Sequence, residues 1–334
     1  MLNLSILNLV PIRQGQTFPH AIEAMTSLAQ LAERLNFTRY WIAEHHNMPN
    51  MASSSTQLLI QHTLANTQKI SVGAGGVMLP NHAPLQVAEQ YGTLSQLYPN
   101  RVQIGLGRAP GTDMRTAAAL RRGNTNPDFA QDITELRRYF SEESRNDSVK
   151  AYMSIGQNVP LIILGSSPES AYLAAELGLP YAFASHFAPR FLEMAVEIYR
   201  REFKPSVVLA KPYVIVGANA IVAETDQKAE SLATSQTKLF YGIVSGNMQQ
   251  LQPPFASEQA FWQAHASPFI GQEQQAVKSM TSCSFIGSPN SVKQQLQNFR
   301  KQVEFDELMA VSYIFDEKLQ HRSYEMLAEV VKTL

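Results

Sequence analysis

The sequence has little of three things that often identify a class of protein: cysteine, surplus charge and long apolar runs. Cys283 is the only cysteine among 334 residues, which excludes an internal disulfide and any Cys-x-x-Cys site for zinc or an iron–sulfur cluster. A chain so poor in cysteine suits a reducing compartment, and we expect a cytoplasmic protein.

The charges are balanced, because Lys and Arg number 27 against 28 for Asp and Glu. No surplus positive field attracts phosphate backbones or anionic lipids, so we expect neither nucleic acid nor a membrane as partner. No stretch stays apolar for about 18 residues, and the first residues lack the basic start and cleavage site of a signal peptide. We therefore expect neither a membrane span nor a signal peptide.

What the sequence does have is a regular alternation of two patterns. Short apolar runs rich in β-branched and aromatic residues are followed by longer segments with apolar residues at helical spacing, which indicates βα units. The predicted strands are Leu4–Val10, Thr38–Ala43, Ile70–Leu79, Arg101–Leu106, Pro160–Leu164, Pro180–Ser185, Tyr213–Val222 and Glu307–Ile314. Eight strands close a barrel, so the α/β fold predicted is a single (β/α)8 TIM-barrel domain over residues 1–334.

The predicted helices are Pro19–Leu35, Ser53–Ala65, Pro84–Leu97, Phe129–Phe140, Pro168–Leu177, Pro189–Phe203, Asp226–Val244 and Leu319–Val331. Two stretches interrupt the alternation, Gly123–Asp128 with its extension to Gln157, and Ser245 to about Ser288. The second lies between the seventh and eighth predicted strands and carries an aromatic group. It is either a lid over the barrel or a helical patch that extends the core.

The densest group of ionisable residues follows the second predicted strand, as Glu44-His45-His46. Active sites of this fold lie at the C-terminal ends of the strands. Successive side chains of a strand face opposite sides, so His45 and His46 are poorly placed to chelate one metal, and we expect no metal site. An imidazole here either acts as a general acid or base or is held in place by Glu44.

Glycines dominate the end of the third strand and the turn after the fourth. Gly75 and Gly76 fall within a run in which a planar ring can lie against bare backbone, or in which a bulge forms without a ligand. The turn after the fourth strand carries Arg108, a cation suited to phosphate or carboxylate. Pro110 interrupts GxGxxG spacing there, which disfavours a dinucleotide fold.

An anion site is also predicted after the fifth strand, where Gly165-Ser166-Ser167 leads into a helix near Pro168. Serine hydroxyls, including that of Ser170, and the first N–H groups of the helix can donate to a phosphate. Ordinary capping of the helix by Ser167 is the compatible structural alternative. The combined strand ends fit a phosphorylated, planar cofactor.

At these residues the sequence resembles the bacterial luciferase-like flavin-dependent oxidoreductases, in the subgroup of the YhbW-type and MsnO8-like proteins. The segments that carry the resemblance are WIAEHHN at 41–47, GAGGVMLPNHAPLQVAEQ at 73–90, RVQIGLGRAPG at 101–111, LGSSPESAYLAAELGLPYAFASHFAP at 164–189 and FKP at 203–205. The resemblance implies a barrel with an insertion, a homodimer, and reversible binding of FMN or, in some branches, the deazaflavin F420.

The resemblance also implies residue roles and a reaction. His45 matches the catalytic acid–base histidine, Gly75-Gly76 the pair joined by a cis peptide beneath the flavin, and Arg108 the phosphate-binding arginine. Gly107 stands in place of the family's cysteine, and Gly165 in place of the glutamate that opens its phosphate motif. FMN, supplied reduced by a separate reductase, is favoured over F420 as the cofactor.

Three functions follow as hypotheses. The first is an O2-dependent monooxygenase acting on a small organic substrate. The second is a non-catalytic flavin-binding or accessory protein, because the cofactor-holding residues are more distinct than any substrate-specific feature. The third is F420-dependent hydride transfer at the same pocket.

Overall fold

A computed structural model describes residues 2–121, 128–265 and 267–334. Its strands are β1 (Asn3–Asn8), β2 (Arg39–Ile42), β3 (Ser71–Met78), β4 (Val102–Gly107), β5 (Leu161–Gly165), β6 (Tyr181–Phe183), β7 (Val214–Val222), β8 (Ser284–Gly287) and β9 (Glu307–Val311). All pairings between these strands are parallel, and the β6–β7 pairing closes a ring of eight, β1 to β7 with β9. The predicted (β/α)8 barrel is confirmed, and its eight strands are the eight predicted ones with shifted ends.

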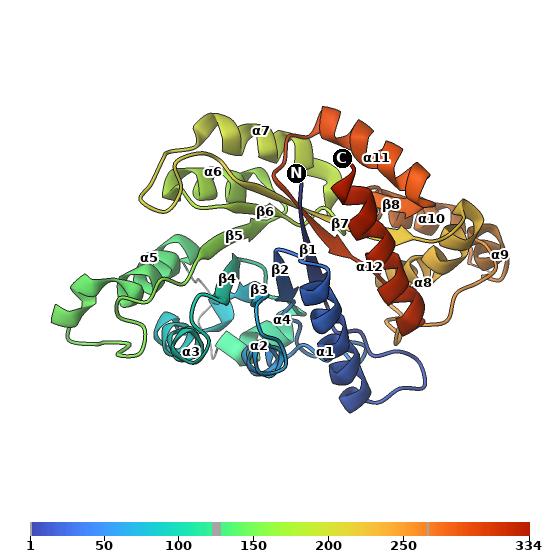
Figure 1. The fold of residues 1–334 in the computed structure, drawn as a ribbon. Coiled ribbons are helices and arrows are strands. Elements are labelled where there is room, and N and C mark those ends of the chain that lie inside the picture. Colours follow the sequence, from blue (N-terminus) through green and yellow to red (C-terminus); the bar gives the residue numbers. More distant parts are fainter. Residues whose placement is uncertain (1, 122–127, 266) are drawn as a thin grey trace.

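Helices surround the ring (Figure 1). The α-helices are α1 (Phe18–Arg34), α2 (Thr56–Ala65), α3 (Pro84–Leu97), α4 (Met114–Arg121), α5 (Phe129–Phe140), α6 (Pro168–Leu177), α7 (Leu192–Glu202), α8 (Asp226–Ser245), α9 (Glu258–Gln263), α10 (Ile270–Met280), α11 (Pro289–Gln302) and α12 (Glu317–Lys332). The 3-10 turns are η1 (Leu79–Asn81), η2 (Glu142–Asn146) and η3 (Pro189–Phe191). Prolines in the first turns of α1, α3, α6 and α11 explain several starts, because proline needs no N–H partner there.

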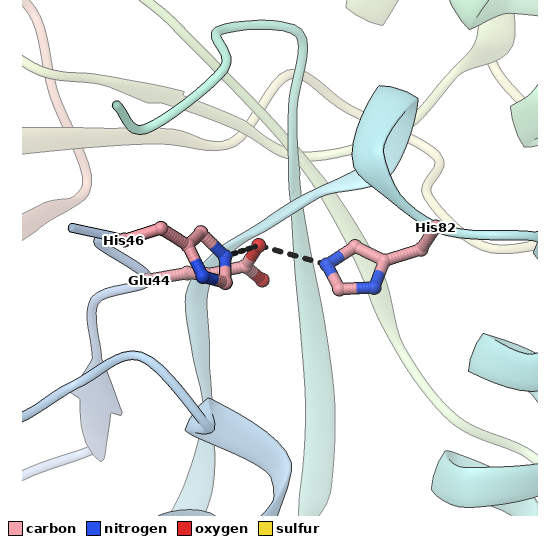
Figure 2. Close-up of side chains that lie close together, drawn as sticks. All are labelled: Glu44, His46 and His82. Carbon is pink, nitrogen blue, oxygen red and sulfur yellow. Dashed lines mark hydrogen bonds and ion pairs between the residues drawn. The ribbon is translucent and has the colours of Figure 1, made fainter. Parts of the chain in front are cut away.

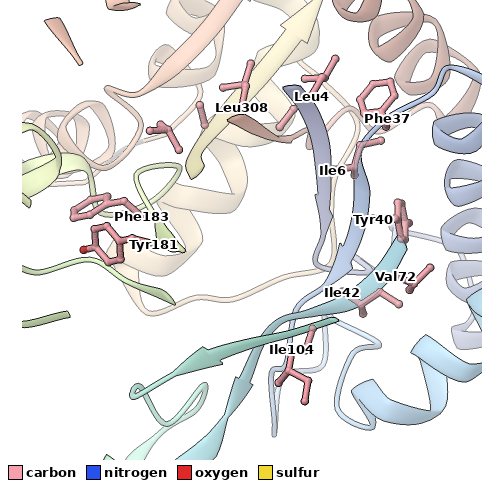
Figure 3. Close-up of a cluster of buried hydrophobic side chains, with 14 of the residues drawn as sticks. Leu4, Ile6, Phe37, Tyr40, Ile42, Val72, Ile104, Tyr181, Phe183 and Leu308 are labelled. Carbon is pink, nitrogen blue, oxygen red and sulfur yellow. The ribbon is translucent and has the colours of Figure 1, made fainter. Parts of the chain in front are cut away.

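Two apolar layers hold the barrel together. Strand residues that point outward, such as Ile6, Tyr40 and Ile104, pack against the ring of helices (Figure 3). Strand residues that point inward, such as Trp41 and Ile215, form a separate core inside the ring. A strand buried on both faces needs apolar residues at nearly every position, and all nine residues of β7 are buried accordingly.

The insertion after β7 joins the inner core. Phe240 of α8 packs edge-to-face on Tyr313, with ring centroids 5.9 Å apart, and Phe261 and Trp262 of α9 belong to the same cluster as the inward strand residues. Leu251 exchanges backbone hydrogen bonds with Ile12 and Gln14, beyond the end of β1. The insertion therefore extends the core over part of the C-terminal end of the barrel, as the helical-patch alternative predicted.

The sequence prediction was incomplete in the two interrupting stretches. Residues 122–127, the start of the first interruption, lie outside the described residues. The second was predicted as either a lid or a helical patch, and it contains two helices, α9 and α10, together with the unpredicted strand β8; the unpredicted helix α11 follows it. Strand β8 pairs with the last four residues of β7 and lies outside the ring, so one strand more than the barrel requires is present.

Candidate active site

The C-terminal ends of β2, β3 and β4 are adjacent in the ring, and backbone hydrogen bonds join the loops that follow them. His46 N–H donates to Gly111 O at 3.1 Å, and the Thr112 hydroxyl donates to His46 O at 2.8 Å. Gly111 has a φ of +63°, and a Cβ there would lie 2.8 Å from Glu44 O. Glycine is thus required for the loop after β4 to pass this close to the Glu-His-His run.

Glu44 is the centre of a buried hydrogen-bonded group at this rim. Its Oε1 lies 2.9 Å from His46 Nε2 and 2.8 Å from His82 Nε2, so the two imidazoles reach the same oxygen from opposite sides (Figure 2). Its Oε2 accepts from Met78 N–H at 3.3 Å. Burial raises the pKa of Glu44, but the hydrogen bonds and charges of His46 and His82 outweigh burial and lower it. The carboxylate is therefore ionised and fastens the end of β2 to that of β3.

This group also has the composition of a metal site. Glu44, His46 and His82 place one potential ligand atom each within 4.8 Å of the others. Both Nε2 atoms, however, lie at ordinary hydrogen-bond distances from Oε1. Two imidazole N–H groups that donate to one carboxylate oxygen explain the arrangement without a metal. Glu44 thus holds two histidines, His46 and His82. The predicted alternative, an imidazole held in place by Glu44, applies to His46.

His45 lies apart from this group. Its Nδ1 is buried and has no hydrogen-bond partner among the described residues. Burial lowers the pKa of His45, against an opposing interaction with the Gly111 backbone and the charge of Glu44. The imidazole is therefore neutral at neutral pH, with a ring nitrogen able to accept or donate a proton.

His186, two residues beyond the Ala184 that follows β6, lies close enough to His45 for the two rings to interact electrostatically. Its side chain is buried, and its Nδ1 also has no hydrogen-bond partner within the described part of the chain. Burial, with a smaller contribution from His45, lowers the pKa of His186 to about 3. His45 and His186 are thus two buried imidazoles with lowered pKa values, and the Nδ1 atom of each lacks a partner among the described residues.

The glycine run of β3 contains the expected cis peptide, between Gly75 and Gly76. The pairing of β3 with β4 shifts register between Ala74 and Val77, so the bulge of the structural alternative is present too. A Cβ on Gly75 would lie 2.8 Å from Leu7 Cδ1, and one on Gly76 would lie 2.7 Å from Gly105 O. Packing inside the barrel therefore requires both glycines, whether or not a ligand approaches them.

Arg108 follows β4 and the start of α6 follows β5, and these two strands are neighbours in the ring. The charge of Arg108 contributes to lowering the pKa of Glu169, in the first turn of α6. The larger contributions come from the Ser167 hydroxyl and from the backbone of Glu169 itself. The side chain of Arg108 is exposed. The strand that precedes Arg108 is thus the neighbour of the strand that leads into α6, and phosphate binding at these residues stays a prediction.

The serines of this segment have different surroundings. Ser170 donates to Ser167 O at 2.6 Å and lies 2.9 Å from Tyr181 Oη, so its hydroxyl is already engaged. A Cβ on Gly165 would lie 2.0 Å from Ser170 Oγ, which explains glycine there. Ser167 occupies the N-cap position of α6, but its side chain makes no capping hydrogen bond. The expectation that Ser167 caps the helix is therefore wrong, since its hydroxyl turns to Glu169.

Several site residues were not identified from the sequence. His82 reaches Glu44 from η1, 38 positions along the chain, and no local pattern marks it. Asn219 was passed over inside the apolar strand VIVGANAIV, although one amide in a fully buried strand was a usable signal. His186 follows the sixth predicted strand, and a single histidine there carries no pattern that marks it as a site residue.

Comparison with known proteins gives a consistent result. The profile of the family described as luciferase-like monooxygenase matches residues 3–304. The chain is 46% identical to YvbT of Bacillus subtilis, over 98% of this chain and 96% of that protein. It is 43% identical to the luciferase-like monooxygenase of Escherichia coli K12, over 99% and 97%. The crystal structure of apo-MsnO8 superposes with a TM-score of 0.90 at 32% identity, covering 99% of both chains.

Among the described residues, the longest helices are too short or too polar to cross a lipid bilayer.

Proposed function

The chain belongs to the luciferase-like monooxygenase family, and on that premise we propose that it is an FMN-dependent monooxygenase that uses reduced flavin and O2 to oxidise a small organic substrate. The observation that supports FMN most is that Arg108 follows β4 and the start of α6 follows β5, two neighbouring strands of the ring. A flavin phosphate needs donors and positive charge at one end of the pocket, and a proton-transfer group is useful at the other, where His45 lies.

The residues at α6 fit a phosphate, because a carboxylate already uses the same donors. The Ser167 hydroxyl, the backbone of Glu169 itself and, to a smaller extent, the charge of Arg108 lower the pKa of Glu169. An exposed side chain can rotate away and leave these donors to a bound phosphate. We assign phosphate binding to Arg108, Ser166, Ser167 and the loop at Gly165, with Ser170 holding Ser167 in position.

The ring is assigned to the β3 side of the pocket. Gly75 and Gly76 enter this assignment through the family resemblance, since packing alone accounts for glycine at both positions.

Reduced flavin, when bound, supplies the electrons with which one oxygen atom of O2 is transferred to the substrate. The residues of the chain orient the reactants and protect the reacting centre from water. His45 Nδ1, neutral and buried, accepts or returns a proton at the reacting centre. Glu44 fixes the loops on either side, and the insertion around α8 limits the access of water to this end of the barrel.

The experiment is turnover with enzymatically reduced FMN, ¹⁸O2 and a panel of small sulfides, ketones and aldehydes. Labelled product is expected with the wild type. His45→Ala should bind FMN with unchanged affinity and lose about a hundredfold or more in turnover, the usual range for a general acid or base. His62→Ala, an exposed histidine of α2, is the matched control.

Unchanged turnover in His45→Ala would remove His45 from the mechanism. Peroxide as the sole product, with flavin consumption that no substrate alters, would instead favour the accessory protein. Equilibrium binding of FMN and F420 side by side decides between the two cofactors. A separate reductase and a homodimer complete the proposal.

A further inference from the structure

The sheet divides at Asn219. Up to this residue β7 pairs with β9, in the register Asn219 to Val311, and from it onward β7 pairs with β8, in the register Asn219 to Ser284. Asn219 is separated by an even number of residues from Ile215, which faces the inside of the barrel. An amide side chain therefore lies on the inner wall at the point where the strand changes partner.

Hydrogen bonds fix the orientation of the Asn219 amide. Its Nδ2 donates to His186 O at 2.7 Å and to Ser284 Oγ at 3.2 Å. Exchange of the amide oxygen and nitrogen would place two acceptors, Oδ1 and His186 O, against each other. The outcome is that Oδ1 is the free end, and this atom has no hydrogen-bond partner among the described residues although the side chain is fully buried.

A second amide has the same character. Gln236 of α8 donates through Nε2 to Ser284 Oγ at 3.4 Å, while its Oε1 has no partner within the described ranges and the side chain is 3% exposed. Ser284 Oγ in turn donates to Thr281 O at 2.6 Å. The amide nitrogens of Asn219 and Gln236 thus meet at one hydroxyl, and their two carbonyl oxygens remain near it without donors.

Unpartnered buried acceptors are costly, because burial removes their hydrogen bonds to water without replacing them. Besides these two oxygens, His186 Nδ1 lacks a partner among the described residues, and the backbone carbonyl of the same residue accepts the hydrogen bond from Asn219. The charge of His45 contributes to lowering the pKa of His186, so the two groups interact electrostatically. A ligand group that donates hydrogen bonds would satisfy the oxygens, and the connection through His186 leads from them to the proposed proton-transfer residue.

We propose that Asn219, Gln236 and His186 form a substrate subsite that holds an uncharged hydrogen-bond donor, a hydroxyl or an amide N–H, on the molecule to be oxidised. That the ligand is the substrate rests on the proposed function; the binding preference itself does not. The side chains that hydrogen-bond within this subsite are amides and a hydroxyl, so it offers neither a carboxylate for a cation nor an ammonium or guanidinium for an anion.

The test is binding of matched probes to the full chain without flavin, by saturation-transfer NMR and calorimetry. Benzyl alcohol is compared with benzyl methyl ether, and benzamide with N,N-dimethylbenzamide; each second probe lacks the donor. Benzylamine and benzoate probe charge. We expect the donor of each pair to bind about tenfold more tightly than its partner, and the two ions to bind more weakly than the alcohol.

Variants locate the preference. Asn219→Leu should abolish the difference within each pair, and Gln236→Leu, which leaves β7 intact, should reduce it if Asn219→Leu does not fold. Asn290→Leu, on the exposed first turn of α11, is the matched control and should keep it.

Equal binding within both pairs, or a preference that survives Asn219→Leu and Gln236→Leu, would overturn the subsite. Neither flavin nor turnover enters this assay. A preference for donor probes in a protein that binds no FMN would therefore support the subsite and contradict the proposed function. FMN binding without such a preference would contradict the subsite and leave the proposed function unaffected.

Discussion

The two ends of the barrel use buried polar residues in opposite ways. At the N-terminal end, Glu307 of β9 and Arg39 of β2 form an ion pair in which both carboxylate oxygens have several partners. At the C-terminal end, His45, His186 and Asn219 each leave a buried polar atom without a partner among the described residues. At the first end both oxygens of Glu307 are paired, and Arg39 Nε, which lacks a hydrogen bond of good geometry, still lies 2.8 Å from Glu307 Oε1. We call this the saturated end, and the other end retains capacity for a ligand.

The saturated end is a closed network. Glu307 Oε1 lies 2.5 Å from Ser5 Oγ and 2.8 Å from Arg39 Nε, and Oε2 accepts from Arg39 at 2.9 Å and from Tyr213 Oη at 2.7 Å. Arg39 also donates to Gln103 at 2.8 Å. A buried charge pair satisfied in this way positions strands but has no free group for chemistry. This contrast is what locates function at the opposite end.

The largest effect is expected at the saturated end. Glu307→Gln removes one partner of the buried pair and leaves the Arg39 charge uncompensated, so the free energy of unfolding should fall by about 3–5 kcal/mol. Chemical denaturation measures this, with Glu329→Gln, in an exposed pair with Lys332, as a control expected to change by less than about 0.5 kcal/mol. A loss below about 1 kcal/mol, or a change in FMN affinity, would contradict the division of roles.

The next effect is a pH dependence that comes from His186. Its pKa is lowered to about 3 by burial, against 6.5 in the unfolded chain, so between these values only the unfolded state takes up the proton. Stability is complete above pH 6.5 and falls with decreasing pH, by about 1.4 kcal/mol per unit for one histidine. His186→Asn should have a flatter slope of unfolding free energy between pH 6.5 and 5. An identical slope would mean that the imidazole is charged in the folded protein.

The smallest effect concerns the carboxylate that uses the phosphate donors. Glu169→Gln removes a negative charge from the start of α6 and should strengthen FMN binding a few-fold at low salt, with the gain fading as salt increases. Glu193→Gln, in the first turn of α7, is the matched control. Isothermal titration at two salt concentrations measures both, and weaker FMN binding in Glu169→Gln would place the phosphate elsewhere.

How far the sequence predicted the molecule depends on how local each signal is. All eight ring strands were found because strands buried on both faces are apolar almost throughout. Strand β8 was missed because only Phe285 and Gly287 of its four residues are buried, and α11 was missed because only Val292 and Leu296 are buried in it. The Glu-His-His run could be identified because, like each strand, it is a contiguous pattern in the sequence.

The partners of that run were not visible. His82 and Asn219 belong to the site only because the ring brings separate strand ends together, and nothing in their neighbouring residues records this. Periodicity indicates which face of an element is buried, but not which loop meets which. Ser167 occupies the predicted N-cap position of α6, but the sequence pattern does not determine whether its hydroxyl points at the helix N–H groups, and it makes no capping hydrogen bond.

The central claim, that FMN binds at the open end with its phosphate between Arg108 and α6, is tested most directly by one comparison of affinities. FMN and riboflavin, which lacks the phosphate, are titrated into the wild type, Arg108→Ala and, as a control, Arg115→Ala of the neighbouring α4. The account predicts that Arg108→Ala weakens FMN about tenfold or more and leaves riboflavin nearly unchanged. Equal losses for the two flavins, or none for FMN, would contradict it.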